Sequence, residues 1–153
     1  AELYAKTLSF NGYEETARNV PLMKKLALMD LESWKAVRDD VTQWGLSLKD
    51  QGYKLGILSN MPYEFLDLYE KEIALFTNAD HAVFSCRVKI IKPEKEIYLE
   101  ALRGLGVKPE EAVFFDDVQE NIDAALSLGI HGKLWTGLEN AQKDWHSTIL
   151  KEE

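Results

Sequence analysis

The sequence has little cysteine, little histidine and no long apolar run. One cysteine among 153 residues cannot form an internal disulfide, which fits a reducing compartment, so we expect a cytoplasmic protein. No apolar stretch reaches the roughly 20 residues of a membrane span, and no signal peptide is visible, so we expect no membrane partner. The three histidines, His81, His131 and His146, share no metal-ligand spacing, and we expect them at the surface or at the edge of a cap.

Positive charge is also scarce. The 18 Lys and Arg residues against 26 Asp and Glu residues give a net charge of -8, which argues against a nucleic-acid surface. An anionic substrate would therefore have to be held by local positive groups. A hydrophobic content of 46% is typical of a globular chain, and 153 residues suffice for one domain with a real core.

The apolar pattern changes character near residue 40. Residues 1–40 are predicted to be helical, and an amphipathic helix is expected to begin at Asp30 and to end near Gly52. Beyond it, strand-like and helix-like stretches alternate, which predicts an α/β fold: a three-layer, Rossmann-like parallel sheet with right-handed crossovers. The predicted strands are 53–58, 82–86, 112–115 and 132–136, and helices are predicted after Pro62, after Pro93 and from Glu120 to Leu128.

Asp116 and Asp117 follow the apolar run Ala112 to Phe115. In open α/β sheets, ligands bind at the carboxyl ends of the strands, and paired carboxylates there favour a hard cation such as Mg2+. The alternative is a solvated turn in which one aspartate caps the next helix.

Two further polar pairs follow predicted strands. Ser59 and Asn60 end the first strand, where a hydroxyl and backbone N–H groups at a helix start can bind an anion, or where the serine is an ordinary N-cap. Lys92 precedes Pro93 after the second strand and is either a ligand for an anion or a solvated surface lysine. Because loops at the carboxyl ends of parallel strands meet on one face, these groups are expected to converge. A cation and an ammonium around an anion pocket are what phosphoryl transfer requires.

These stretches resemble motifs II, III and IV of the haloacid dehalogenase superfamily, in its phosphatase-type branch with a helical cap. The similar segments are Leu55 to Asn60, Lys92 to Glu94 and Phe114 to Asn121, and the resemblance covers roughly residues 41 to 137. It implies an HAD-like core over residues 41–153 and a remnant of the cap, the part that selects the substrate, over residues 1–40.

The resemblance also implies a role for each matched residue. Ser59 would hydrogen-bond the phosphoryl group, Asn60 would line the same pocket, and Lys92 would bridge the phosphoryl oxygens and the nucleophile. Asp117 would bind Mg2+, with Asp116 as co-ligand or in the layer behind it, and Asn121 would order the loop. The implied substrate is a small phosphorylated metabolite.

One part of the superfamily pattern is missing. Its nucleophile is an aspartate in an N-terminal Asp-x-Asp motif on the central strand, and no such motif precedes Ser59. The chain also begins at Ala1 without a methionine. We therefore expect a C-terminal fragment, inactive alone, whose sheet is completed by a missing N-terminal segment or by a second chain.

Other interpretations remain open at this point. A sugar-phosphate mutase or a true haloacid dehalogenase belongs to the same superfamily, although Asp116 and Asp117 favour its metal-dependent branch. A non-catalytic HAD-like binding module is the alternative from another class. Cys86, in an apolar run, is interpreted as a buried structural thiol, and Gly104 to Gly106 follow a helix and so are not a dinucleotide loop.

Overall fold

The structure is a computed structural model that describes residues 39–149. The chain divides between Val37 and Arg38 into two units, and every described residue lies in the second. Residues 1–38 of the predicted cap remnant, and the first part of the helix predicted from Asp30, therefore lie outside the described residues.

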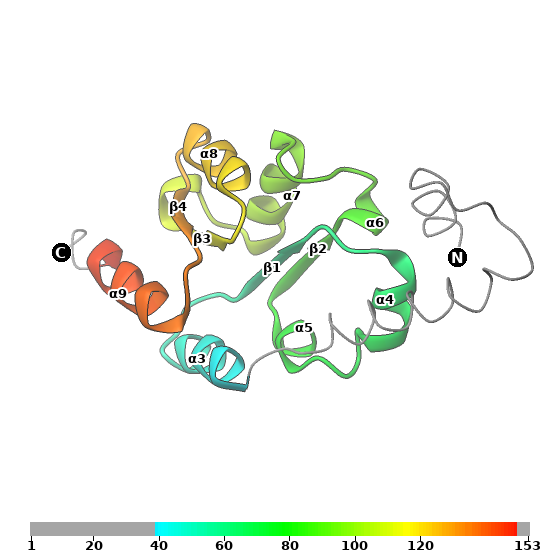
Figure 1. Cartoon of the computed structure of the whole chain (residues 1–153), viewed down its shortest axis with the longest axis horizontal. Helices are drawn as coiled ribbons and strands as arrows, with labels where there is room; N and C mark the ends of the chain where they lie inside the picture. Colours follow the sequence, from blue (N-terminus) through cyan, green and yellow to red (C-terminus); the bar gives the residue numbers. More distant parts are fainter. Residues whose placement is uncertain (1–38, 150–153) are drawn as a thin grey trace, which may run out of the picture. The chain divides into compact units, whose positions relative to one another are not determined.

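Helices and strands alternate along the described chain, as the sequence predicts (Figure 1). In order they are α3 (Asp39–Asp50), β1 (Gly56–Ser59), α4 (Tyr63–Tyr69), α5 (Ala74–Asn78), β2 (His81–Phe84), α6 (Ser85–Val88), α7 (Lys95–Leu105), η1 (Pro109–Glu111), β3 (Val113–Asp116), α8 (Gln119–Ser127), β4 (His131–Leu134) and α9 (Leu138–Ile149). No helix among these combines the length and the apolar character that a membrane crossing needs.

Some boundaries differ from the prediction. The first strand begins at Gly56 instead of Tyr53, because the Asp80 carboxylate accepts a hydrogen bond from the Leu55 amide at 2.8 Å and holds the approach to the strand. Cys86 lies in α6 and not in a strand. The C-terminal helix α9 was not predicted, since its sequence is mostly polar and only one side of it is buried.

The strands pair in parallel, as predicted, but they form two sheets and not one. One sheet joins β1 to β2 and the other joins β3 to β4, with Ser59 opposite Phe84 and Asp116 opposite Leu134. Two separate pairs are what an α/β core without its central strand is expected to show. The physical reason is that β1 and β3 lie too far apart to share a ladder, and cavities fill the space between them.

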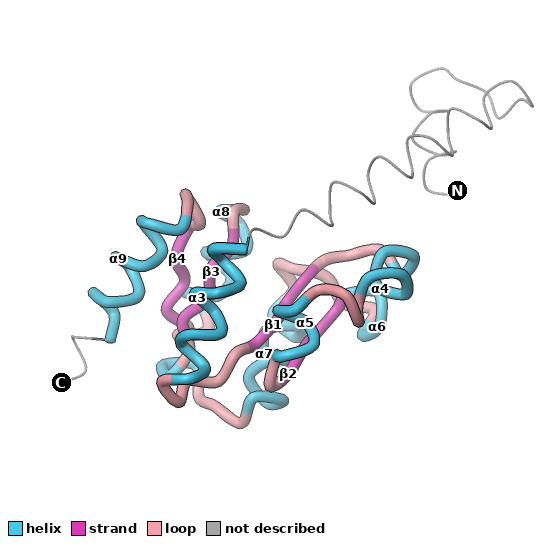
Figure 2. Tube along the Cα trace, turned by 90° about the horizontal axis from the view of Figure 1, so that it is seen from below, coloured by secondary structure: helices cyan, strands magenta, loops and turns pink. Residues whose placement is uncertain are grey.

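Helices cover both sides of the strands. Helices α7 and α8 lie on one side of them, while α3 and α5 lie on the other (Figures 1 and 2). The main core forms under α7 and α8 from apolar side chains that recur at helical spacing. Its buried members are Val83, Ile97, Tyr98, Leu102, Ala125 and Ile130.

The facing edges of β1 and β3 carry unpaired peptide groups. The Leu55 carbonyl accepts from the Asp80 amide, so along the extended strand the peptide groups of Gly56 and Leu58 point away from β2. Likewise, the Ala112 and Asp116 carbonyls accept from β4 and from Trp135 just beyond it, so those of Val113 and Phe115 point away from β4. Such edges are ready to pair with another strand.

Two cavities occupy this gap, which we call the inter-sheet slot. Residues 56–58 of β1 and 113–114 of β3 line both cavities. The cavity on the α7 side has a volume of about 300 Å³ and the one on the α3 side about 390 Å³. Aromatic side chains bound the second cavity, where Phe115 packs edge-on against Trp44 and Trp135.

Candidate active site at the carboxyl ends of the strands

Ser59 is the last residue of β1 and Asp116 is the last residue of β3. Both strands are parallel to their partners, so these residues lie at the carboxyl end of the inter-sheet slot. The loops that follow β1 and β3 supply Asn60 and Asp117, and the loop between α6 and α7 supplies Lys92. The five residues that the sequence singles out therefore belong to one end of the strands, which is where α/β sheets bind ligands.

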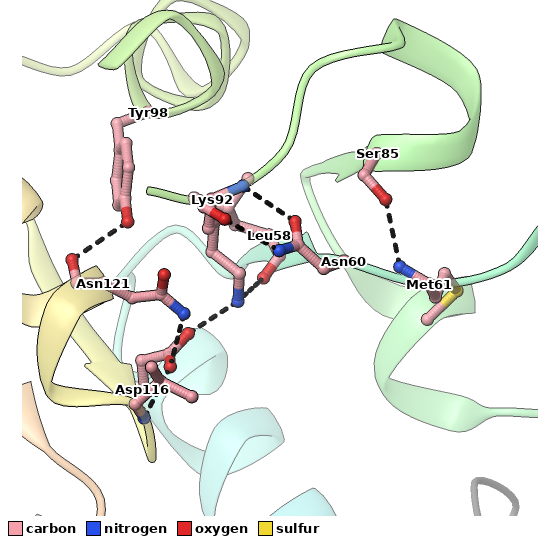
Figure 3. A network of polar contacts seen from close by, with 9 residues as sticks. Leu58, Asn60, Met61, Ser85, Lys92, Tyr98, Asp116 and Asn121 are labelled. Carbon is pink, nitrogen blue, oxygen red and sulfur yellow. Dashed lines mark hydrogen bonds and ion pairs between the residues drawn. The ribbon is translucent and has the colours of Figure 1, made fainter. Parts of the chain in front are cut away.

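Asp116 is the centre of a buried polar network (Figure 3). Its Oδ2 atom lies 2.6 Å from the Lys92 ammonium, and its Oδ1 atom accepts from the Asn121 side chain and the Val118 amide, both at 2.9 Å. Its side chain is 5% exposed. Burial raises the pKa of Asp116, but the hydrogen bonds from Lys92, Asn121 and Val118 together hold it below its ordinary value of 3.8. Asp116 is therefore a carboxylate with both oxygens already engaged.

The Lys92 ammonium spans the inter-sheet slot. It donates to Asp116 on β3 and to the Leu58 carbonyl on β1, the latter at 3.1 Å, and it lies 5.6 Å from the centre of the Phe114 ring. The Leu58 carbonyl lies on the edge of β1 that points away from β2, where Lys92 takes the place of a strand donor. The Lys92 side chain is 11% exposed and bonds to both strands, so Lys92 is not a solvated surface lysine.

Asn60 lies beside Lys92, but its side chain bonds to the lysine backbone. Its Nδ2 atom donates to the Lys92 carbonyl at 3.0 Å, and its Oδ1 atom accepts from the Lys92 amide at 2.9 Å. The sequence predicts that Asn60 lines the phosphate pocket. In the structure, both ends of its side-chain amide are engaged by the Lys92 backbone.

Helices α7 and α8 support the network from behind. Asn121, which was expected to order its loop, donates to Asp116, and its own carbonyl accepts from the Tyr98 hydroxyl at 2.9 Å (Figure 3). Tyr98 is 1% exposed and packs edge-on against Phe114. Burial, followed by the charge of Asp116, raises the pKa of Tyr98 to about 12. The hydroxyl is thus held as a neutral donor.

Ser59 and Asp117 are the two groups left available for a ligand. No other residue among 39–149 hydrogen-bonds the Ser59 hydroxyl or pairs with the Asp117 carboxylate, and Asp117 is exposed. Within the same range, no three His, Cys, Asp or Glu side chains gather as a complete metal site. A cation here would combine Asp117 with ligands from elsewhere, as Mg2+ commonly does by retaining water.

Sequence reasoning missed two contributors, Tyr98 and Ser85. Tyr98 lies among the buried apolar residues of α7, so its spacing alone indicates only packing. Ser85 comes directly after the second strand, as the first residue of α6, and its hydroxyl accepts from the Met61 amide at 3.1 Å (Figure 3). A polar residue at the end of a parallel strand, as with Ser59, was the signal that could have identified Ser85.

The remaining candidates keep structural roles, with one correction. Cys86 is a half-buried free thiol, and His131 and His146 bond to backbone carbonyls. His81 was expected at the surface, but its ring packs against Gly104 and its Nε2 atom is buried without a hydrogen-bond partner. The absence of a side chain at Gly104 makes room for that ring.

Curated phosphatases are among the sequence relatives of this chain. The chain is 34% identical over 100 residues to the putative phosphatase YhcW of Bacillus subtilis, covering 65% of this chain and 45% of the relative. It is 35% identical over 83 residues to the phosphorylated carbohydrates phosphatase of Thermotoga maritima, covering 54% of this chain and 38% of the relative. The chain thus spans less than half the length of these curated relatives.

Solved structures show the same fold. An HAD phosphatase from Thermococcus onnurineus, 34% identical, matches with a TM-score of 0.57 over 63% of this chain and 45% of its own. A predicted HAD-like family hydrolase from Porphyromonas gingivalis, 24% identical, matches with a TM-score of 0.66 over 90% of this chain and 69% of its own. The family model of the haloacid dehalogenase-like hydrolases matches residues 4–129. Together with the three strand-end motifs, that match means that the chain belongs to the haloacid dehalogenase-like hydrolase family.

Proposed function

We propose that this chain is part of an Mg2+-dependent phosphomonoester hydrolase that acts on a small phosphorylated metabolite in the cytoplasm. The observation that carries the proposal is the largely buried Lys92 ammonium, held by Asp116 at the carboxyl ends of the strands, where Ser59 ends β1. The phosphatase names of relatives from Bacillus subtilis and Thermotoga maritima support the substrate class. The single cysteine supports the compartment.

Lys92 and Ser59 would hold the phosphoryl group. The overall charge of -8 repels an anion, so the local positive charge of Lys92 has to offset that field. Because Asp116 fixes the ammonium before substrate arrives, little reorganisation is needed as negative charge builds up on the peripheral oxygens. The Ser59 hydroxyl supplies a neutral donor to the same group.

Asp117 would hold the metal, with Asp116 in the layer behind it. Both oxygens of Asp116 are engaged by three donors, whereas Asp117 is exposed and offers a hard carboxylate oxygen. This donor set fits Mg2+ if further ligands arrive with the missing strand and from water. When bound, Mg2+ would neutralise charge on the transferring phosphoryl group.

The nucleophile would arrive on a strand that fills the inter-sheet slot, from a segment outside this sequence or from a second chain. The peptide groups of residues 56, 58, 113 and 115 point toward the slot and away from the partner strands. This supports an added strand that would pair with β1 on one side and with β3 on the other. Apolar cavities on both faces favour a strand that is apolar on both faces, as in buried parallel sheets. Its carboxyl end would place an aspartate opposite Lys92, and that carboxylate would attack phosphorus as the bond to the leaving oxygen breaks. The leaving oxygen would take a proton from water or an acid to give the alcohol, and water would then hydrolyse the aspartyl-phosphate to phosphate and the free carboxylate.

Filling the slot can be tested directly. We would add a peptide of about ten residues with an apolar run that ends in Asp-x-Asp, and compare it with the same peptide carrying a central proline. Trp44, Trp135 and Trp145 line the slot, so binding of the first peptide should shift tryptophan fluorescence, while the proline peptide should not. Equal fluorescence responses to both peptides would contradict the binding of a strand in the inter-sheet slot.

The metal role is tested in the protein with its sheet completed. Asp117→Asn should abolish Mg2+-stimulated hydrolysis of a generic phosphomonoester while thermal stability is kept. Asp123→Asn is the matched control, because it removes the same charge from an exposed position of α8 and should retain activity. Unchanged activity in Asp117→Asn would exclude Asp117 from the site, and activity of this chain alone would contradict a missing nucleophile.

A further inference from the structure

Asn60 and Lys92 form a two-bond ring between loops that are 32 positions apart in the chain. The Asn60 amide donates to the Lys92 carbonyl and accepts from the Lys92 amide, at 3.0 and 2.9 Å (Figure 3). If the Asn60 side-chain amide were inverted, its NH2 group would face the Lys92 amide and its oxygen would face the Lys92 carbonyl. Only one orientation of Asn60 therefore satisfies both bonds.

The ring holds the residue whose side chain spans the inter-sheet slot. A lysine side chain is a point charge on a flexible four-carbon stem, so the position of its ammonium depends on where its backbone is fixed. In this chain the ammonium has to reach Leu58 on one strand and Asp116 on the other. The bond from the Met61 amide to the buried Ser85 hydroxyl fixes the loop just beyond Asn60.

We propose that Asn60 is a positioning residue for Lys92 and not a substrate contact. Both ends of its amide are already engaged, and contact with a phosphoryl group would require breaking at least one of these bonds. The ring fixes the lysine backbone, and Asp116 then fixes the ammonium. The catalytic part of this inference rests on the proposed phosphatase function, whereas the ring itself does not.

Two variants separate the two bonds. Asn60→Ala removes both, whereas Asn60→Asp is nearly isosteric, keeps the acceptor for the Lys92 amide and places an oxygen against the Lys92 carbonyl. Asn78→Ala is a matched control, since Asn78 is exposed and its amide bonds only to Ala74 and Thr77 within α5.

The ring is tested in this chain by amide hydrogen exchange, without any need for activity. The Lys92 amide should exchange about tenfold faster in Asn60→Ala, because one intramolecular bond corresponds to about that factor, and it should stay protected in Asn60→Asp and Asn78→Ala. Unchanged exchange in Asn60→Ala would overturn the ring. Should Asn60→Ala fail to fold, the Asn60→Asp variant decides, since loss of Lys92 protection there would also overturn it.

The catalytic role is tested by a double-mutant cycle in the protein with its sheet completed. Asn60→Ala should lower kcat for a generic phosphomonoester about tenfold, with KM changed less than kcat. In a Lys92→Ala background, the same substitution should lower kcat no further, because the positioned group is gone. Equal losses in both backgrounds would mean that Asn60 acts directly or only through stability, and would overturn the proposal. Absence of any hydrolysis in the parent protein would instead refute the phosphatase function, and the exchange test would still decide the ring.

Discussion

The ion pair between Asp116 and Lys92 can be broken with a single isosteric substitution. Asp116→Asn keeps the shape of the side chain but removes its charge. Three donors, from Lys92, Asn121 and Val118, converge on the native carboxylate. An asparagine has one acceptor oxygen, so whichever way it turns, its NH2 group faces a donor and the Lys92 ammonium loses its counter-charge.

The expected cost is about 3 to 5 kcal/mol in the free energy of unfolding at pH 7, the usual range when one partner of a buried ion pair is removed. The side chains of Lys92 and Asp116 are 11% and 5% exposed, so this is a buried ion pair. Glu139→Gln is the control, because its pair with Lys143 is 2.7 Å long but 68% and 83% exposed. Pairs of that kind contribute about 0.5 kcal/mol.

Urea unfolding followed by tryptophan fluorescence measures both variants. Lys92→Met and the double variant complete a cycle, in which we expect a coupling of about 1 to 3 kcal/mol. If Asp116→Asn costs no more than Glu139→Gln, or if the two single losses simply add, the buried pair has no energetic role and the reasoning fails.

The same pair predicts a pH dependence of the stability. The pKa of Asp116 is lowered on folding, so its stabilisation is complete above the ordinary value of 3.8. It is lost as the pH falls through the lower pKa of the folded state. The difference in unfolding free energy between wild type and Asp116→Asn should therefore shrink below about pH 4. A difference that stays constant down to pH 2 would contradict this assignment.

Two further predictions concern stability. The pKa of Tyr98 is raised to about 12, so its contribution to the free energy of unfolding is complete below about pH 10 and lost between about pH 10 and 12. Over that range, the unfolding free energy of wild type should fall by about 3 kcal/mol relative to Tyr98→Phe. An equal fall in both proteins would refute this. Gly104→Ala should destabilise the chain by about 1 to 3 kcal/mol in urea unfolding, although alanine favours a helix, because the new Cβ would lie 2.0 Å from the His81 ring. Adding His81→Ala should remove that loss, and a stabilising Gly104→Ala alone would be the contrary result.

Much of the α/β order could be predicted from periodicity alone. Apolar runs such as Val113 to Phe115 have no helical spacing, and each is followed by an acidic or hydroxyl residue and then by an amphipathic stretch. The parallel pairing follows from that alternation. Periodicity does not indicate the split into two sheets, because which strands are neighbours depends on distant parts of the chain; it is the resemblance, which lacks the motif of the central strand, that implies the gap.

For the site, the sequence predicts which residues gather but not what each one bonds to. Ser59, Lys92 and Asp116 each end or follow a strand, and this position in the chain brings them to one edge. The engagement of Asn60 by the Lys92 backbone could not be predicted, because it joins loops 32 positions apart at hydrogen-bond precision. Helix α9 was missed because it buries few residues, among them Ala141 and Thr148, and so shows a weak apolar pattern.

The bridge that Lys92 forms between Leu58 and Asp116 has a mechanical consequence. One lysine side chain ties β1 to β3 at the carboxyl ends of the strands, where the two sheets share no ladder. Because a carbonyl oxygen has two lone pairs, the Leu58 carbonyl could accept from the strand of the proposed function while Lys92 keeps its own bond to it. In the proposed function, the lysine bridge would thus preset the spacing between β1 and β3 that an entering strand meets.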